Sequence, residues 1–176
     1  LLGVSIIYCS VGELKNLKIA INKRIYQLCL FQITFVIISF LTLITAFIIS
    51  DFSIITVYQN SHSLKPLLYK ISGTWGNHEG SLLLWVIILT TFSFFFLLYS
   101  KNHQKNYRIT SLIIQNILIL GFLFFLIFNS NPFSIVAPTP REGLGLNPIL
   151  QDPALAIHPP LLYLGFVGSS IYFSAA

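Results

Sequence analysis

One histidine is followed directly by two prolines, His158-Pro159-Pro160, at the start of an apolar run. A residue before proline is pushed out of the α region, so we expect His158 to be extended. The prolines have φ preset for a first helical turn, so a helix should begin there. An imidazole at that mouth, kept neutral by the positive end of the helix dipole, suits an axial haem ligand. The alternative is a histidine that caps the helix through a hydrogen bond.

A second polar segment, residues 74–81, also leads directly into an apolar run. It carries Trp75, whose amphipathic ring suits the headgroup level of a membrane, and two glycines that permit tight turns. His78 and Glu79 place titratable side chains at the same edge. Trp75, His78 and Glu79 could form one wall of a cofactor site. The alternative is an interfacial turn anchored by its tryptophan.

The other residues that could do metal or thiol chemistry show no supporting pattern. His62 and His103 lie in polar sequence without partners at metal-ligand spacing, so we interpret them as solvated loop residues. Cys9 and Cys29 lie far apart in apolar stretches and belong to neither a CxxC nor a CxxCH motif. A thiol redox pair or a covalent haem attachment is therefore not expected here, and both cysteines are interpreted as small buried hydrophobes.

The chain is composed for a lipid environment: 55% of its residues are hydrophobic and 9% are charged, against roughly 25% charged in soluble domains. Full spans, long enough for the hydrocarbon layer, are predicted at 26–49, 82–98, 109–128 and 158–176, with a partial span at 1–12. We therefore predict an all-α, polytopic transmembrane helix bundle that forms a single membrane domain over 1–176. Both ends look cut, which is typical of a fragment of a larger protein.

Charge separates the connections into two kinds. The charged residues are Glu13, Lys15, Lys18, Lys23 and Arg24 (sum +3), Lys101, Lys105 and Arg108 (+3), Asp51, Lys65, Lys70 and Glu79 (0), and Arg141, Glu142 and Asp152 (−1). Basic loops stay on the side of synthesis, so the two long loops, 50–81 and 129–157, are predicted to face the outer compartment. The basic residues also suit the lipid bilayer, and nucleic-acid binding is not expected. The uncharged spans disfavour an ion-coupled transporter.

Four stretches together resemble the CcmF-type cytochrome c haem lyases. They are Ser50-Asp-Phe52, Trp75-Gly-Asn-His-Glu-Gly-Ser-Leu-Leu-Leu-Trp85, Ser130-Asn-Pro-Phe-Ser134, and Leu146-Asn-Pro-Ile-Leu-Gln-Asp-Pro153 running through His158-Pro-Pro-Leu-Leu-Tyr-Leu-Gly165. The resemblance implies that two external histidines flank a tryptophan-rich WWD segment, with His158 in the place of the first. It also implies a second histidine pair that holds a b-type haem inside the membrane. The WWD segment, the second external histidine and both intramembrane ligands are absent from this sequence.

The resemblance predicts a haem-handling part of a lyase that attaches haem to apocytochrome c through thioethers, incomplete by itself. Haem would be bound transiently, with its second ligand supplied from elsewhere. Expected partners are the remaining lyase part with the WWD segment, the haem chaperone CcmE and apocytochrome c. The alternative is a structural membrane subunit, for example of a respiratory-chain complex, derived from a lyase that lost its catalytic role.

The abundance of residues specified by AT-rich codons indicates an organellar gene. We therefore expect the mitochondrial inner membrane, with the long loops in the intermembrane space. A bacterial-type plasma membrane is the alternative.

Overall fold

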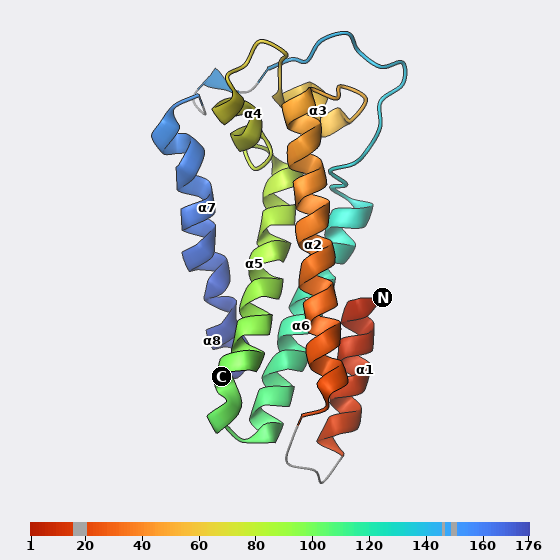
Figure 1. Ribbon diagram of the computed structural model, residues 1–176, viewed down its shortest axis with the longest axis vertical. Coiled ribbons are helices and arrows are strands. Elements are labelled where there is room, and N and C mark those ends of the chain that lie inside the picture. The colour runs from red at the N-terminus through yellow and green to blue at the C-terminus, as the bar shows by residue number, and fades with distance from the viewer. Residues whose placement is uncertain (16–20, 146, 149–150) are drawn as a thin grey trace. The chain divides into compact units, whose positions relative to one another are not determined.

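The structure is a computed structural model that describes residues 1–15, 21–145, 147–148 and 151–176. Its helices (Figure 1) are α1 Leu2–Leu14, α2 Lys23–Ile49, α3 Ile55–Asn60, α4 Leu67–Gly73, α5 His78–Tyr99, the 3-10 helix η1 Ser100–Asn102, α6 Lys105–Phe128, α7 Pro153–Gly168 and α8 Ser170–Ala175. Within these ranges the only extended pairing is an isolated bridge between Ile54 and Ile135. Lys18, Leu146, Ile149 and Leu150, which entered the sequence analysis, lie outside the described residues.

Four helical segments are long and apolar enough to cross a membrane: Lys23–Ile49, His78–Asn102, Lys105–Phe128 and Pro153–Ala175. α1 is apolar but shorter. The predicted all-α fold, with four full spans and a partial first span, is therefore confirmed, and the chain is a membrane protein. The assignment of the whole chain to one membrane domain stays a prediction.

Each of the four long helices begins a few residues before the predicted span, because an apolar run marks the stretch in lipid whereas a helix begins at its N-cap. Arg24 N donates to Asn22 Oδ1 at 3.0 Å before α2, and Gly80 N donates to Asn77 Oδ1 at 2.7 Å before α5. Such contacts satisfy amides that a helix leaves unpaired at its start.

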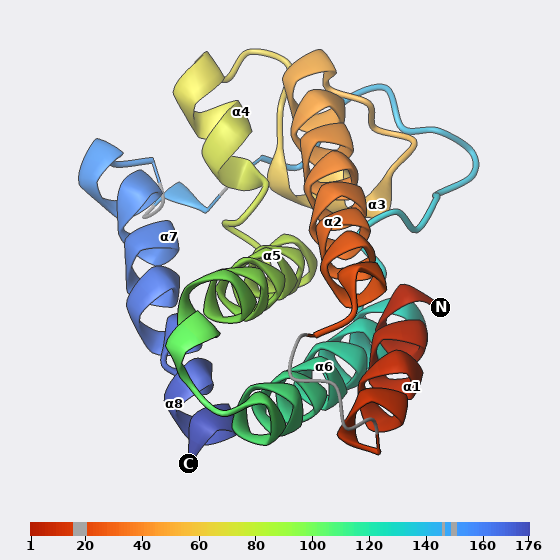
Figure 2. The same cartoon turned by 60° about the horizontal axis from the view of Figure 1, so that its bottom comes forward.

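The described residues form two compact units. The first unit comprises Leu1–Ile37, Val86–Phe124 and Leu164–Ala176, and the second unit comprises Ile38–Trp85 and Phe125–Tyr163. In the first unit α1 lies alongside α6 (Figure 2). Gly3 permits this approach, since a Cβ there would lie 2.8 Å from Leu120 Cδ2.

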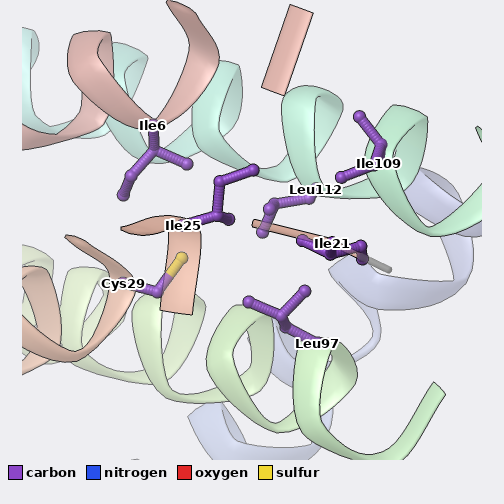
Figure 3. Close-up of a cluster of buried hydrophobic side chains, with 7 residues drawn as sticks. All are labelled: Ile6, Ile21, Ile25, Cys29, Leu97, Ile109 and Leu112. Atoms are coloured by element: carbon purple, nitrogen blue, oxygen red, sulfur yellow. The ribbon is translucent and has the colours of Figure 1, made fainter. Parts of the chain in front are cut away.

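A hydrophobic cluster holds the first unit together (Figure 3). Its members are Ile6, Ile21, Ile25, Cys29, Leu97, Ile109 and Leu112. Both cysteines are free; Cys29 is buried as predicted, whereas Cys9 is only half-buried.

The first unit also buries charged groups. Arg108, which is 7% exposed, donates from Nε to Ser100 Oγ at 2.9 Å. Its Nη2 donates to Leu97 O at 2.7 Å and to Tyr26 Oη at 3.0 Å. Lys105 forms an ion pair with Glu13 at 3.0 Å. The expectation of uncharged spans therefore holds for the apolar runs but not for the helices, because α6 already begins at Lys105.

In the second unit the two long loops are hydrogen-bonded to each other. The backbone bonds are Ile55 N to Ser134 O (2.8 Å), Val136 N to Ser53 O (2.8 Å), Leu144 N to Tyr58 O (2.8 Å) and Gly145 N to Ser61 O (3.0 Å). Gly143 is needed for this approach, because a Cβ there would lie 2.1 Å from Ser61 O.

Glu142 closes the contact between the loops. Its carboxylate accepts hydrogen bonds from Ser63 Oγ at 2.5 Å, Ser63 N at 2.9 Å and Gly143 N at 3.0 Å. These bonds, above all that from the Ser63 hydroxyl, lower the pKa of Glu142 from its ordinary 4.5 to about 2. Charge-assisted bonds of this kind favour the ionised carboxylate.

Candidate functional site

The helix that carries His158 is capped by Asp152 and begins at Pro153, not at the histidine. Asp152 Oδ1 accepts the backbone N–H groups of Ala154 at 2.8 Å and Leu155 at 3.1 Å, and Pro153 is the first helical residue. His158 lies in the second turn of α7. The predictions that His158 is extended and stands at the helix mouth are therefore wrong. Asp152 supplies a capping oxygen and Pro153 a φ angle preset for a helix, so together they mark a helix start more strongly than His158 and its two prolines do.

The two prolines lie inside α7, where each removes a backbone donor. An amide normally bonds to the carbonyl four residues before it, so Pro160 leaves Ala156 O without its usual helical partner. Trp75 supplies a replacement, because its indole Nε1 donates to Ala156 O at 2.8 Å. One hydrogen bond within the second unit therefore joins the two segments that the sequence singled out.

Trp75 is held in place by the turn between α4 and α5. Asn77 Nδ2 donates to Gly73 O at 2.6 Å while its Oδ1 caps α5, so this side chain ties the end of one helix to the start of the next. Gly80 is required, since a Cβ there would lie 1.6 Å from Thr74 O. The indole also stacks on Phe40, with ring centroids 6.5 Å apart and an interplanar angle of 19°.

An open pocket of about 330 Å³ lies beside this hydrogen bond. It is lined by Trp75, Gly76, Asn77, His78, Ser81, Pro159 and Tyr163. The His78 side chain is exposed, and its ring meets that of Phe125 edge-on at a centroid distance of 6.3 Å. Glu79 is half-buried in the first turn of α5, where a carboxylate suits the helix dipole. Of the predicted wall, the structure thus brings Trp75 and His78 to the pocket.

The His158 side chain is exposed, and no described residue forms a hydrogen bond with its ring. Asp152 performs the capping role that was the alternative for this histidine, so that alternative is wrong. The next residue, Pro159, lines the pocket. An imidazole in such a position is accessible to a metal ion through its ring nitrogens.

The other histidines are engaged elsewhere. His62 Nδ1 accepts the backbone N–H of Leu64 at 3.2 Å and lies 3.8 Å from the Glu142 carboxylate, so His62 belongs to the contact between the loops. His103 lies against Tyr107, with ring centroids 5.5 Å apart. Over the described ranges, no three His, Cys, Asp or Glu side chains gather as a possible metal site. This part of the chain therefore offers single imidazoles and no complete ligand set.

Four residues of the site were not predicted as site residues from the sequence. Asp152 before Pro153, and Asn77 before the apolar run of α5, are start signals that could have been read. Phe40 and Tyr163 could not have been found this way. Both lie in apolar runs, where sequence does not separate a ring that packs on protein from one that faces lipid.

Comparison with known proteins identifies the family. Residues 75–176 match the family model described as cytochrome C assembly protein. The chain is 46% identical over 165 residues to the cytochrome c-type biogenesis protein CycK of Rhizobium meliloti, which covers 94% of this chain and 24% of that protein. It is 45% identical over 139 residues to the cytochrome c-type biogenesis protein CcmF of Escherichia coli, which covers 78% of this chain and 22% of that protein.

The chain thus spans about a quarter of the length of these relatives. No solved structure matches it. The resemblance to CcmF-type proteins is confirmed, and the matched range contains both Trp75 and the His158 segment. Because the match extends over more than half of its residues, the chain belongs to the cytochrome C assembly protein family.

Proposed function

We propose that this chain is a haem-handling part of a cytochrome c haem lyase, with His158 as an axial ligand of the haem iron. The observation that carries the proposal is the exposed His158 ring, which no described residue engages in a hydrogen bond. Its helix is capped by Asp152, so the ring has no capping task. The relatives are named as cytochrome c-type biogenesis proteins, which favours haem as the group that the ring binds.

The residues near His158 fit one side of a haem site. The neighbouring pocket, which Pro159 lines and His158 does not, offers the rings of Trp75 and Tyr163 as walls, and Pro159 fixes the backbone between that pocket and the histidine. When bound, haem supplies the vinyl groups to which the thiols of apocytochrome c add. The task of this chain is to hold the iron from one side and to orient the group. The second ligand and the WWD platform come from another polypeptide or another part of a longer chain.

The proposal implies partner proteins and a membrane in which the chain works. CcmE would deliver haem, apocytochrome c would accept it, and the WWD-bearing part of the lyase would complete the site. The long loops would face the mitochondrial intermembrane space, supported by the basic short connections and the organellar composition. The matched relatives named above are bacterial, so a bacterial-type plasma membrane is the alternative setting.

A structural membrane subunit, for example in a respiratory-chain complex, is the competing function. It is favoured by the way Trp75 and Asn77 are used for internal contacts, and by the absence, among the described residues, of a cluster of three His, Cys, Asp or Glu side chains. It is disfavoured by the exposed imidazoles of His158 and His78, which such a subunit does not need.

Haem absorbance of the protein purified with its native partners tests the proposal. We expect His158→Ala to lower haem content and cytochrome c maturation together, because one axial ligand is lost. His62→Ala is the matched control, since that ring serves the contact between the loops. Full haem content and normal maturation in His158→Ala would contradict haem ligation and favour the structural subunit.

A further inference from the structure

We propose that Trp75 is a positioning residue for His158 and acts through the backbone carbonyl that Pro160 leaves free. The indole Nε1 lies 2.8 Å from Ala156 O, and the Ala156 side chain is 3% exposed. Ala156 precedes His158 by two residues in the same helix. The inference rests on the proposed function of His158, and it gives Trp75 a task beyond that of a pocket wall, because its indole N–H acts on the backbone of α7.

The turn that carries His158 is short of internal hydrogen bonds. Pro159 and Pro160 remove the helical donors for the carbonyls of Leu155 and Ala156, which belong to two consecutive peptide units. Consecutive losses of this kind bend a helix or loosen it unless other groups take over. The direction in which His158 projects therefore depends on a contact from outside α7.

Trp75 is suited to provide that contact because it is itself constrained. Its ring stacks on Phe40, and the turn that holds its backbone is fixed by Asn77 and by the close approach at Gly80. The indole N–H is a donor only, so it pairs well with a carbonyl whose usual partner is missing. A rigid connection thus runs from the start of α5 to the second turn of α7.

The inference is tested by one tryptophan variant placed in two proline backgrounds. Trp75→Phe keeps an aromatic ring over Phe40 but removes the N–H donor. Pro160→Ala restores an amide that can bond to Ala156 O within the helix, so the indole donor becomes redundant. Pro159→Ala is the matched control, because it restores the donor to Leu155 O and leaves Ala156 O dependent on Trp75.

The haem affinity of the protein purified with its native partners, measured by haem titration, should fall by about tenfold in Trp75→Phe, as expected when one buried hydrogen bond is lost. The same substitution should have little effect in the Pro160→Ala background and its full effect in the Pro159→Ala background. Equal effects in both backgrounds would overturn the inference.

Hydrogen exchange in residues 155–164 of the haem-free protein gives a second readout that does not depend on ligation. Trp75→Phe should speed exchange there, and Pro160→Ala should cancel the increase. If Trp75→Phe speeds exchange while His158→Ala keeps its full haem content, the positioning role is supported and haem ligation by His158 is rejected. Unchanged exchange in Trp75→Phe would reject the positioning role itself.

Discussion

The two units of the chain use their polar side chains in different ways. In the first unit Arg108 and Gln115 are buried and bonded to groups on other helices. In the second unit the loops are joined mainly through backbone atoms, and two imidazoles, His78 and His158, are exposed. The buried polar side chains of the first unit thus stabilise helix packing, whereas His158 of the second unit is exposed and forms no hydrogen bond through its ring with any described residue.

This difference indicates where binding chemistry can lie. A buried side chain that satisfies neighbouring carbonyls cannot leave them without cost, so Arg108 is a structural residue. An exposed imidazole on a backbone fixed by other groups can bind without disturbing the fold. The predictions below test this division between a structural first unit and a binding second unit.

The largest effect is expected at Gly80, a glycine of the second unit where an added Cβ would overlap the backbone. Gly80→Ala places a Cβ 1.6 Å from Thr74 O, so the turn that holds Trp75 must open. We expect a loss of at least about 3 kcal/mol in the free energy of unfolding, the upper range for overpacking. Thermal unfolding in detergent micelles measures it.

The matched control for Gly80 is Gly121 in the first unit, where a Cβ meets nothing within 4 Å. Gly121→Ala should stabilise α6 by about 0.5–1 kcal/mol through helix propensity. A similar loss in both variants would mean that the close approach at Gly80 is not what holds the turn.

The next effect concerns the structural role of the first unit. Arg108→Ala removes the donors to Ser100 Oγ, Leu97 O and Tyr26 Oη. We expect a loss of about 2–3 kcal/mol, since hydrogen bonds from charged groups contribute about 1.5–3 kcal/mol each and water can replace part of them. Arg141→Ala, at an exposed arginine of the second unit, should stay within about 0.5 kcal/mol. Equal losses would remove the contrast between the units.

A smaller effect is expected at Gln115, which is 1% exposed within α6. Its Nε2 donates to Ser170 Oγ at 2.9 Å, and its Oε1 accepts from Ser174 Oγ at 2.6 Å. Gln115→Leu should cost about 1 kcal/mol, because hydrogen bonds between membrane helices are worth only about 0.6–2 kcal/mol. Denaturant titration in mixed micelles measures the difference.

Asn116 is the matched control on the same helix, since its amide donates to Leu112 O of α6 itself at 3.0 Å. Asn116→Leu should be neutral or stabilising. If it costs as much as Gln115→Leu, the bonds between α6 and α8 are not the source of the loss.

The spans could be predicted from sequence because a long run of uncharged apolar residues is stable as a helix within the hydrocarbon layer. The helix starts could not be read from that signal, since Asn22, Asn77 and Asp152 lie upstream of the apolar runs. The burial of Arg108 was also missed. A basic residue at the end of a span indicates topology in the sequence, whether it faces water or forms hydrogen bonds inside the protein.

The conformation of His158 was predicted wrongly for a different reason. Two prolines within a helix are unfavourable by local rules, so they were interpreted as its first turn. The structure places them inside α7 and supplies the Ala156 carbonyl with a donor from Trp75, which lies 81 residues away in the sequence. A contact between residues so distant in sequence has no local pattern and is visible only in three dimensions.

The smallest effect is a dependence on pH at the contact between the loops of the second unit. The Ser63 hydroxyl, with the amides of Ser63 and Gly143, lowers the pKa of Glu142 from 4.5 to about 2. The folded state thus keeps this carboxylate ionised where the unfolded chain takes up a proton, so the contact is at full strength above pH 4.5 and weakens toward pH 2. Hydrogen exchange of residues 58–64, compared with Glu142→Gln at each pH, measures this.

Glu142→Gln should show the weaker contact at every pH, because a neutral amide cannot gain the charge-assisted bonds. Ser63→Ala removes the largest cause of the shift, so the weakening should then begin nearer pH 4.5. The exposed carboxylate makes both effects small. A pH profile that stays the same in Ser63→Ala would show that the Ser63 hydroxyl is not what keeps the Glu142 carboxylate ionised, and the amides of Ser63 and Gly143 would then carry the contact.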